Sequence, residues 1–284
     1  MKKTILVLGS TGCLGTSLEK VFKKDKNIKY IGCTHSDLEI SNKNQLEKII
    51  KKNKPDVIIN TVATIGINFC EENPKKAMEV NAFSVFDLSK ICKKNNIVLV
   101  QISTHAVFDG KSKKPYDEND TPNPLNIYGY SKLVSEYFVK QNLKKYFILR
   151  VPTMYGPRRN KTLGFVDKMI NMMSQGKSLK IASDRMDSPT YAYNIANKIN
   201  KLIKSKNYGT YHTFDKGVIS YYELIVEIAK QIGFKGKIKK VKHNDFVSAA
   251  PNPKRVPIKS KKGGTGVFWK KAISKYIKDE NIRC

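Results

Sequence analysis

A tyrosine and a lysine lie four residues apart in the stretch 126–132 (NIYGYSK), which follows two prolines that suit the entry to a helix. On a helix, Tyr128 and Lys132 would share one face, with their Cβ atoms about 5–6 Å apart. A free phenol has a pKa near 10, so proton transfer near neutral pH needs a pKa lower by roughly 3, or ~4 kcal/mol. An ammonium about 5 Å away contributes about 3 kcal/mol at an effective dielectric of ~20, and the helix N-terminus adds up to ~1 kcal/mol. We therefore expect Tyr128 to donate a proton to a carbonyl oxygen. In so lysine-rich a chain, an exposed helix face remains the alternative interpretation.

Three glycines, spaced as Gly9-x-x-Gly12-x-x-Gly15, follow the first predicted strand and open the first predicted helix. That context is what the dinucleotide fingerprint requires. The first glycine permits a tight turn, the second lets the backbone approach a pyrophosphate, and the third allows close packing of helix on strand. The helix N-terminus supplies amide donors. The spacing predicts a nicotinamide dinucleotide cofactor, with Lys132 placed to hold its nicotinamide ribose.

Hydroxyl and small side chains follow two of the predicted strands. Ser103 and Thr104 come directly after the strand expected over 97–102, at the carboxyl edge where open α/β sheets place ligands. A hydroxyl there can hydrogen-bond the same carbonyl oxygen as Tyr128. The sequence NTVA at 60–63 ends the preceding strand with small residues, which leaves room for the nicotinamide ribose.

The second predicted strand is followed by Thr34, His35 and Ser36, without an acidic residue at its end. An Asp or Glu there would hydrogen-bond the ribose 2′-hydroxyl and favour NAD, whereas a neutral or basic end leaves space for a 2′-phosphate. We therefore expect NADP(H) to be preferred, with NAD(H) as the second option. Asp37 comes just after this end, where the alternative interpretation makes it the N-cap of the next helix.

Short β-branched runs alternate with amphipathic segments in the first half of the chain. Such alternation predicts a parallel sheet covered by helices on both faces, that is, a Rossmann-type doubly wound α/β fold. The expected strands cover residues 4–8, 28–33, 57–60, 97–102 and 147–151, and the expected helices cover 13–24, 42–53, 74–95 and 127–142.

After Arg150 this alternation loosens, and the sequence contains no repeat or low-complexity linker. We expect a smaller C-terminal substrate lobe that is interleaved with the sheet. Its segments predict helices over 163–175, 191–205 and 220–232, and strands over 179–182 and 209–214. The expected division is a dinucleotide-binding domain of residues 1–150 plus about 189–213, and a substrate-binding lobe of residues 151–188 and 214–284.

The chain has 284 residues and a formal net charge of +29, and only six of its 53 basic residues are Arg. The Lys residues are spread along the chain, whereas nucleic-acid binding favours a basic face or tail and bidentate Arg. We interpret the positive field as one that attracts an anionic, diphosphate-bearing substrate, and we expect no nucleic-acid partner.

No apolar run approaches the ~20 residues that span a bilayer. The first such run, 4–8, breaks into a glycine turn and is better explained as a strand than as a signal peptide. We expect a soluble, cytoplasmic protein without a membrane partner. The odd number of cysteines, the absence of C-x-x-C spacing and the four scattered His residues predict reduced structural thiols and no metal site. These cysteines are Cys13, Cys33, Cys70, Cys92 and Cys284.

Residues 3–233 resemble the dTDP-4-dehydrorhamnose reductase branch of the extended short-chain dehydrogenases/reductases. The most specific stretch is 103–110 (STHAVFDG), which is close to the family's S-T-D-x-V-F-D-G. Further matches are CEENP at 70–74, the pair Val80-Asn81, and SPT at 188–190.

The resemblance implies hydride transfer from the nicotinamide to C4 of a nucleotide-linked 4-keto-6-deoxy sugar, for surface polysaccharide or glycan biosynthesis. Tyr128 would donate the proton, Thr104 would orient the ketone, and Lys132 would complete the catalytic set. The glycine loop and the resemblance together imply cofactor contacts at Gly9, Thr11, Gly12, Cys13, Leu14, Gly15, Asp37, Leu38, Ala63, Thr64, Ile65, Tyr128 and Lys132. They imply substrate contacts at Thr104, His105, Tyr128 and Thr153.

The chain departs from the family pattern on the substrate side. His105 replaces the family's Asp after the catalytic Thr, and Thr153 begins a segment where the family usually has a bulky aromatic residue. Arg185 and Asp187 stand where the family tends to have Gln and Gly before Ser-Pro-Thr. The ending near Arg255 only loosely resembles the family's R-P-x-x-S-x-L. The sequence therefore leaves the nucleotide and the sugar open.

Other activities of the superfamily are alternatives to ketone reduction. A 4,6-dehydratase needs an Asp-Glu pair after the catalytic Thr, and His105-Ala106 supplies neither. An epimerase-reductase places a Cys near the hydroxyl motif, and the nearest candidates here are Cys70 and Cys92. A plain 4-epimerase stays open. A non-catalytic NAD(P)-binding regulatory subunit is the alternative of another class, although such subunits typically lose the Tyr or the Lys. A homodimer is a further option.

Overall fold

Six parallel strands form the central sheet of the computed structural model, which describes residues 2–160 and 162–283. Their order across the sheet is β10-β5-β4-β3-β1-β2. This topology confirms the predicted parallel α/β sheet. The strands are β1 (Lys3–Leu8), β2 (Ile28–Cys33), β3 (Val57–Asn60), β4 (Val98–Thr104), β5 (Tyr146–Val151) and β10 (Gly209–His212).

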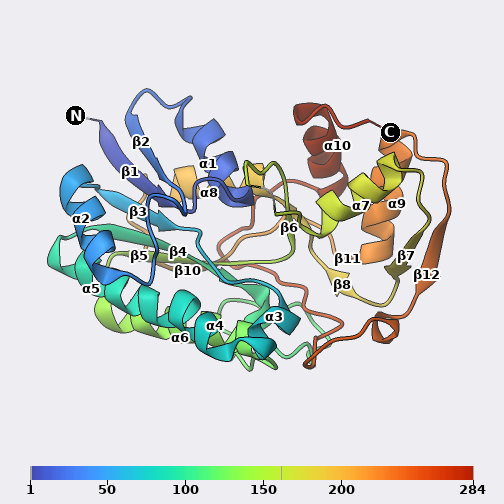
Figure 1. Ribbon diagram of the computed structural model, residues 1–284, viewed down its shortest axis with the longest axis horizontal. Helices are drawn as coiled ribbons and strands as arrows, with labels where there is room; N and C mark the ends of the chain where they lie inside the picture. The colour runs from blue at the N-terminus through green and yellow to red at the C-terminus, as the bar shows by residue number, and fades with distance from the viewer. Residues whose placement is uncertain (1, 161, 284) are drawn as a thin grey trace.

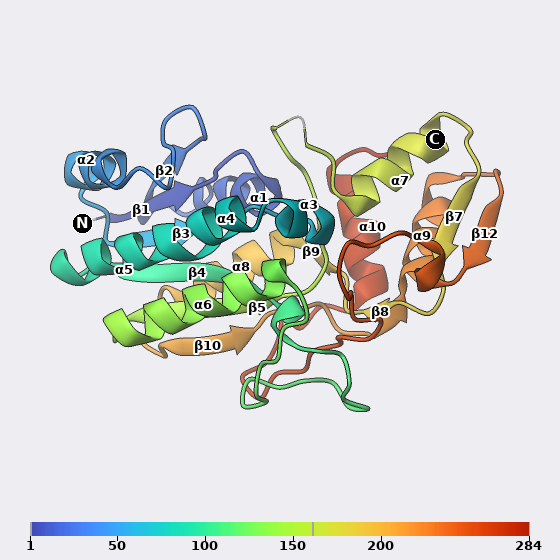
Figure 2. The same cartoon turned by 60° about the horizontal axis from the view of Figure 1, so that its bottom comes forward.

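Helices cover both faces of this sheet (Figures 1 and 2). Successive strand residues point to opposite faces, so Ile5 and Val7 belong to one hydrophobic core while Leu6 and Leu8 belong to another. The predicted doubly wound architecture is therefore confirmed. The first face is covered by α1 (Cys13–Phe22) and α8 (Ala192–Leu202), and the second by α2 (Lys43–Asn53), α5 (Ser84–Lys94) and α6 (Ile127–Asn142).

Two predicted boundaries near the site were wrong. Strand β4 continues through Ser103 and Thr104, which pair with β5 as its last two residues instead of following it. The helix expected over 74–95 is three pieces, because a π-helical turn, η1 (Glu79–Phe83), separates α4 (Pro74–Met78) from α5. A π turn adds a residue to the helical turn and is often found at functional sites. A short helix that was not predicted from the sequence, α3 (Ile67–Glu72), precedes α4.

The C-terminal lobe has its own hydrophobic core, with Leu224 and Ile228 of α9 fully buried. Within this lobe, β6 pairs with β9, β8 with β11, and β7 with β12. Its elements are β6 (Met154–Tyr155), α7 (Phe165–Ser174), β7 (Leu179–Ala182), β8 (Met186–Asp187), β9 (Thr190–Tyr191), β11 (Ile219–Ser220), α9 (Tyr221–Ile232), β12 (Ile238–Val241), the 3-10 turn η3 (His243–Asp245) and α10 (Trp269–Asp279). Another 3-10 turn, η2 (His105–Val107), directly follows β4 of the central sheet.

The chain passes back and forth between the sheet and this lobe. After leaving the sheet at Val151, it returns to contribute α8 and β10 and then enters the lobe again at β11. The domain division stated above remains a prediction in its boundaries. Among the helices of residues 2–160 and 162–283, none combines the length and the apolar character that a bilayer crossing requires.

Candidate active site

A cavity of about 1130 Å³ lies at the carboxyl ends of the central strands. Its lining includes Leu8 at the end of β1, Thr61 after β3 and Thr104 at the end of β4. The sheet order reverses between β1 and β3, which is where doubly wound sheets place their ligands. Tyr221 and Met186 of the C-terminal lobe line the same cavity. Its volume exceeds the ~300–1,000 Å³ of an ordinary small-molecule pocket, so it has room for a cofactor and a substrate.

The glycine loop lines one end of this cavity through Gly9, Thr11 and Gly12. Gly9 has a φ of +80°, and a Cβ there would lie 2.7 Å from the Thr61 hydroxyl oxygen. A Cβ at Gly15 would overlap the Gly9 carbonyl oxygen, so this glycine serves the packing of α1 on the loop and does not line the cavity. The first turn of α1 carries no acidic residue. A helix N-terminus of this kind fits a phosphate.

Several residues after β2 line the same end of the cavity. Thr34, His35 and Leu38 are in the lining, whereas Asp37 is not. The Asp37 carboxylate accepts hydrogen bonds from the Thr34 backbone amide (2.8 Å) and hydroxyl (2.6 Å), and these lower the pKa of Asp37. The alternative role of Asp37 as a helix N-cap was wrong, because Asn42 caps α2.

Two charged residues at this end were missed in the sequence. Glu39 and Lys76 both line the cavity, and the Lys76 charge contributes to lowering the pKa of Glu39, which burial alone would raise. Lys76 lies in α4, far from the glycine loop in sequence. The spacing of residues gave no signal that it reaches the same place.

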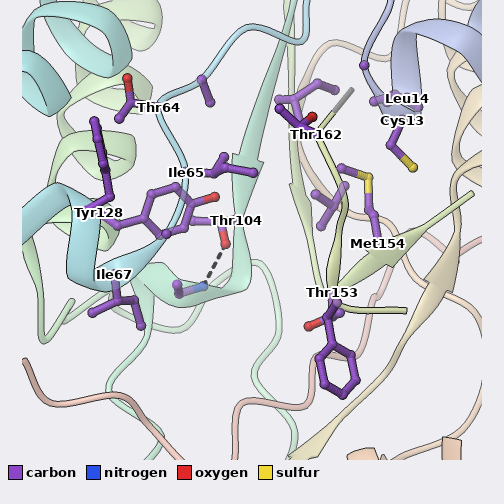
Figure 3. A pocket seen from close by; sticks show the side chains of 18 of the residues that line it. Cys13, Leu14, Thr64, Ile65, Ile67, Thr104, Tyr128, Thr153, Met154 and Thr162 are labelled. Atoms are coloured by element: carbon purple, nitrogen blue, oxygen red, sulfur yellow. Dashed lines mark hydrogen bonds between the residues drawn. The ribbon is translucent and has the colours of Figure 1, made fainter. Parts of the chain in front are cut away.

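The predicted catalytic residues meet at the centre of the cavity. Figure 3 shows the Tyr128 ring pointing toward the Thr104 hydroxyl, with Thr153 and Met154 on the opposite side. Burial raises the pKa of Tyr128 to about 12, and an interaction with the Thr104 hydroxyl offsets part of that rise. The expectation of a lowered Tyr128 pKa was wrong, because desolvation of the phenol dominates and Lys132 is not among the groups that shift this pKa.

Lys132 lies on the buried side of α6 and does not line the cavity. Burial lowers the pKa of Lys132 to about 8, while the Glu136 carboxylate one turn along raises it. Glu136 is held by two Arg150 nitrogens at 2.9 and 2.7 Å and by the Ser103 hydroxyl at 2.6 Å. Neighbouring strand residues face opposite sides, so Thr104 points into the cavity while Ser103 points to this buried ion pair.

The loop after β3 is fixed against α6 by a single amide side chain. Asn81, in the π-helical turn, accepts a hydrogen bond from the Thr64 amide (2.8 Å) and donates to the Thr64 carbonyl (2.9 Å) and the Ser131 hydroxyl (3.0 Å). Ala63, Thr64 and Ile65 consequently line the cavity beside Tyr128. This bridge positions three of the predicted cofactor contacts.

The predicted substrate contacts His105 and Thr153 also line the cavity. The Thr153 hydroxyl lies 2.6 Å from the hydroxyl of Tyr221, a residue of α9 that the sequence did not single out. His105 lies 3.7 Å from Asp187. The structure thus brings together two of the positions at which the chain departs from the family pattern.

The cysteines offer little support for thiol acid/base chemistry. Cys70 and Cys92 are fully buried and do not line the cavity, and burial raises their pKa to about 11 and about 12. Cys13 lines the cavity, but burial raises its pKa to about 12. Cys13, Cys33, Cys70 and Cys92 are free thiols, and Cys284 lies outside the described residues.

Comparison with known proteins identifies a family and several relatives of this chain. Residues 1–281 match the family described as the RmlD substrate binding domain. A crystal structure of a dTDP-4-dehydrorhamnose reductase from Clostridium acetobutylicum is 34% identical, with a TM-score of 0.92 and coverage of 98% of this chain and 99% of that chain. A dTDP-4-dehydrorhamnose reductase from Bacillus anthracis, solved in complex with NADP, is 28% identical, with a TM-score of 0.93 and coverage of 98% and 100%. The methionine adenosyltransferase 2 subunit beta of Xenopus laevis is 28% identical over 261 residues, which are 87% of this chain and 78% of that protein.

Proposed function

The chain belongs to the RmlD substrate binding domain family, and from that premise we propose that it reduces the 4-keto group of a nucleotide-linked 4-keto-6-deoxy sugar. NADPH is the preferred reductant, NADH the second option, and the product enters surface polysaccharide or glycan biosynthesis. One observation carries the proposal: Tyr128 and Thr104 face each other in the same cavity as the glycine loop. A proton donor and a ketone-orienting hydroxyl therefore lie beside a dinucleotide site.

The cofactor is held in this proposal by the glycine loop, by Leu38 after β2, and by residues 63–65 after β3. The close backbone contacts of Gly9 leave no space for a side chain, which fits a loop that approaches a pyrophosphate. The bound nicotinamide supplies the hydride. Gly15 and Lys132 support this site from behind its lining, and Asp37 does so through Thr34.

Tyr128 is the general acid of the proposed reaction. With a pKa of about 12, the phenol keeps its proton at neutral pH, as a donor in the reductive direction must. Thr104 orients the ketone oxygen toward that proton. Lys132, with a pKa of about 8, is mostly charged at neutral pH and lies on the buried side of the same helix as Tyr128.

The substrate in this proposal is an anionic nucleotide-diphosphate sugar. Lys180 and Arg185 line the cavity on the side of the C-terminal lobe, and their positive charge suits a diphosphate. A cytoplasmic location, the absence of a nucleic-acid or membrane partner, and a homodimer remain predictions from the sequence.

Turnover of keto sugars tests the proposal. Purified protein should oxidise NADPH, seen as loss of nicotinamide absorbance, when given dTDP-, UDP-, GDP- or CDP-linked 4-keto-6-deoxy sugars. The identity of the substrates that are reduced then defines the nucleotide and sugar preference. If no ketone in this panel is reduced with NADPH or NADH, the reductase proposal is wrong.

A non-catalytic NAD(P)-binding subunit is the second candidate, because one relative of similar identity is named as a subunit. Against it, Tyr128, Thr104 and Lys132 are all present, and the first two face the cavity. The two candidates differ in the turnover assay: a subunit would bind NADPH and leave every keto sugar unchanged.

A further inference from the structure

The imidazole of His105 lies between two hydrogen-bond acceptors. Its Nδ1 lies 3.1 Å from the Val151 carbonyl oxygen, and its Nε2 lies 3.7 Å from Oδ2 of Asp187. His105 directly follows Thr104, at the first residue of η2. Nδ1 can only donate to the Val151 carbonyl oxygen, and Nε2 faces the Asp187 carboxylate, so this geometry favours a recognition role over a base.

Asp187 is fixed more firmly than His105. Its side chain is 2% exposed, its Oδ2 accepts a hydrogen bond from the Thr153 amide (3.1 Å), and its Oδ1 accepts one from the Ser188 amide (2.7 Å). Among the described residues, His105 is the only basic side chain within 4.0 Å of this carboxylate. A buried carboxylate needs polar partners, and besides these two amides the imidazole is the basic group that lies near it.

The charged residues around the His105–Asp187 contact show how it affects the charge of the cavity. Only two carboxylates, Glu39 and Asp187, are among the described residues that line it. Glu39 is at the end near Leu38, whereas Asp187 is on the side of the C-terminal lobe with Lys180 and Arg185. An uncovered Asp187 would oppose an anionic substrate on this side. His105 directly follows Thr104 in the chain, and its imidazole contacts that carboxylate.

We propose that His105 and Asp187 act as one unit that determines which sugar nucleotide is bound, an inference that rests on the proposed function. Asp187 fixes the imidazole, and the imidazole screens the carboxylate and faces the sugar group next to the reactive ketone. Both residues are departures from the family pattern, and their contact explains why they occur together. Changing either residue alone leaves a mismatch: His105→Asp sets two carboxylates against each other, and Asp187→Gly removes the anchor of the imidazole. Changing both removes the conflict.

A double-mutant cycle tests this unit in the full-length protein. The wild type, H105D, D187G and the double variant are titrated with NADPH and with dTDP-L-rhamnose by calorimetry, and assayed with the panel of keto sugars. Contacting residues couple by up to ~3 kcal/mol, or about 150-fold. We expect H105D to weaken sugar-nucleotide binding at least ~30-fold, D187G about 5-fold, and the double variant less than H105D alone. NADPH binding should stay within about 2-fold in all four proteins.

Further variants separate recognition from folding. H105N keeps a donor toward Val151, and D187N keeps the shape of the carboxylate without its charge, so both remain usable if D187G unfolds. Asp25→Gly is the matched control, because it removes one carboxylate that pairs with Lys204 outside the cavity. Thermal unfolding of each variant identifies losses that come from instability.

The outcomes distinguish the two proposals. The unit is supported if only the affinity for the sugar nucleotide falls and the loss in the double variant differs from the product of the two single losses. A changed ranking of keto sugars in the double variant supports it as well. Independent losses that multiply, or equal losses for NADPH and the sugar nucleotide, overturn it while leaving the reductase proposal intact. If the wild type neither binds dTDP-L-rhamnose nor reduces any keto sugar, both proposals fail.

Discussion

The two halves of the cavity are built in different ways. The cofactor half is made by backbone: the turn at Gly9, the tight contact between Gly15 and the Gly9 carbonyl, and the loop after β3. The substrate half is made by side chains from distant elements, as where His105 after β4 meets Asp187 of β8. Backbone geometry tolerates few sequences, whereas a wall of side chains can be rebuilt. The difference explains why a common cofactor site coexists with an individual substrate site.

The largest effect is expected at the junction of the two halves. Tyr128→Phe removes the proton donor, and general acid catalysis contributes about 10²–10⁴-fold, so we expect kcat to fall about 10³-fold. NADPH affinity should change little, because the ring remains. Steady-state kinetics and a fluorescence titration measure the two quantities.

The matched control for this variant is Tyr130→Phe, since Tyr130 lies two residues along the same helix and is 53% exposed. It should keep wild-type turnover. A Tyr128→Phe protein that retains more than about a tenth of the wild-type kcat would remove Tyr128 from its role.

The cofactor half should be disrupted when a side chain is added at its closest backbone contact. Gly15→Ala places a methyl group against the Gly9 carbonyl oxygen, and overpacking against backbone should cost ~3 kcal/mol or more. Gly12→Ala meets only an ordinary contact at 3.5 Å and should weaken NADPH binding without a comparable loss of stability. Urea unfolding and NADPH titration of both variants measure this contrast. Equal stability of the two variants would contradict the packing role assigned to Gly15.

Lys132 gives a pH-dependent expectation. Its pKa is about 8 in the folded protein against an ordinary 10.5, so between those values the unfolded chain binds more protons and stability rises with pH. The rise attributable to Lys132 is up to ~3 kcal/mol across that window. Lys132→Met should lack it. The measurement is the free energy of unfolding of both proteins at pH 7.5 and 9.5. If the difference between them does not change with pH, Lys132 is not desolvated as described.

The smallest effect is expected from Asp37, behind the cofactor lining. Asp37→Ala removes two hydrogen bonds to Thr34, each worth about 1 kcal/mol at most in an exposed loop. NADPH and NADH affinities should therefore change by about 3-fold or less. Titration with both cofactors measures this. A change above about 30-fold in either would mean that Asp37 contacts the cofactor directly.

The sequence predicted the backbone-made half far better than the other. Alternating buried strands and amphipathic helices follow directly from periodicity, and helix 127–142 matches α6 (Ile127–Asn142). Helix α10 was missed although Trp269, Ala272, Ile273 and Tyr276 form a buried helical stripe that periodicity could have revealed. The π turn was missed as well, because its five residues are too short a stretch for a change in periodicity to be recognised.

Contacts between side chains of distant elements could not be predicted from the sequence, for a different reason. The positions of His105 and Asp187 were noted separately, but only the fold brings η2 and β8 to one cavity and these two side chains to 3.7 Å. The raised pKa of Tyr128 was also unforeseen, since it depends on how much surrounding protein buries the phenol. Both properties depend on tertiary packing, which spacing along the chain does not encode.

Isotope transfer is the most direct test of the central claim that Tyr128, Thr104 and the glycine loop form one reductase site. The protein is incubated with NADPH that carries deuterium at C4 of the nicotinamide and with each keto sugar nucleotide, and the product is analysed by mass spectrometry and NMR. Both faces of the nicotinamide are labelled in turn. The account predicts one deuterium at C4 of the sugar from one of the two labelled cofactors. A product without deuterium from either cofactor, or with deuterium only at another carbon, would contradict it.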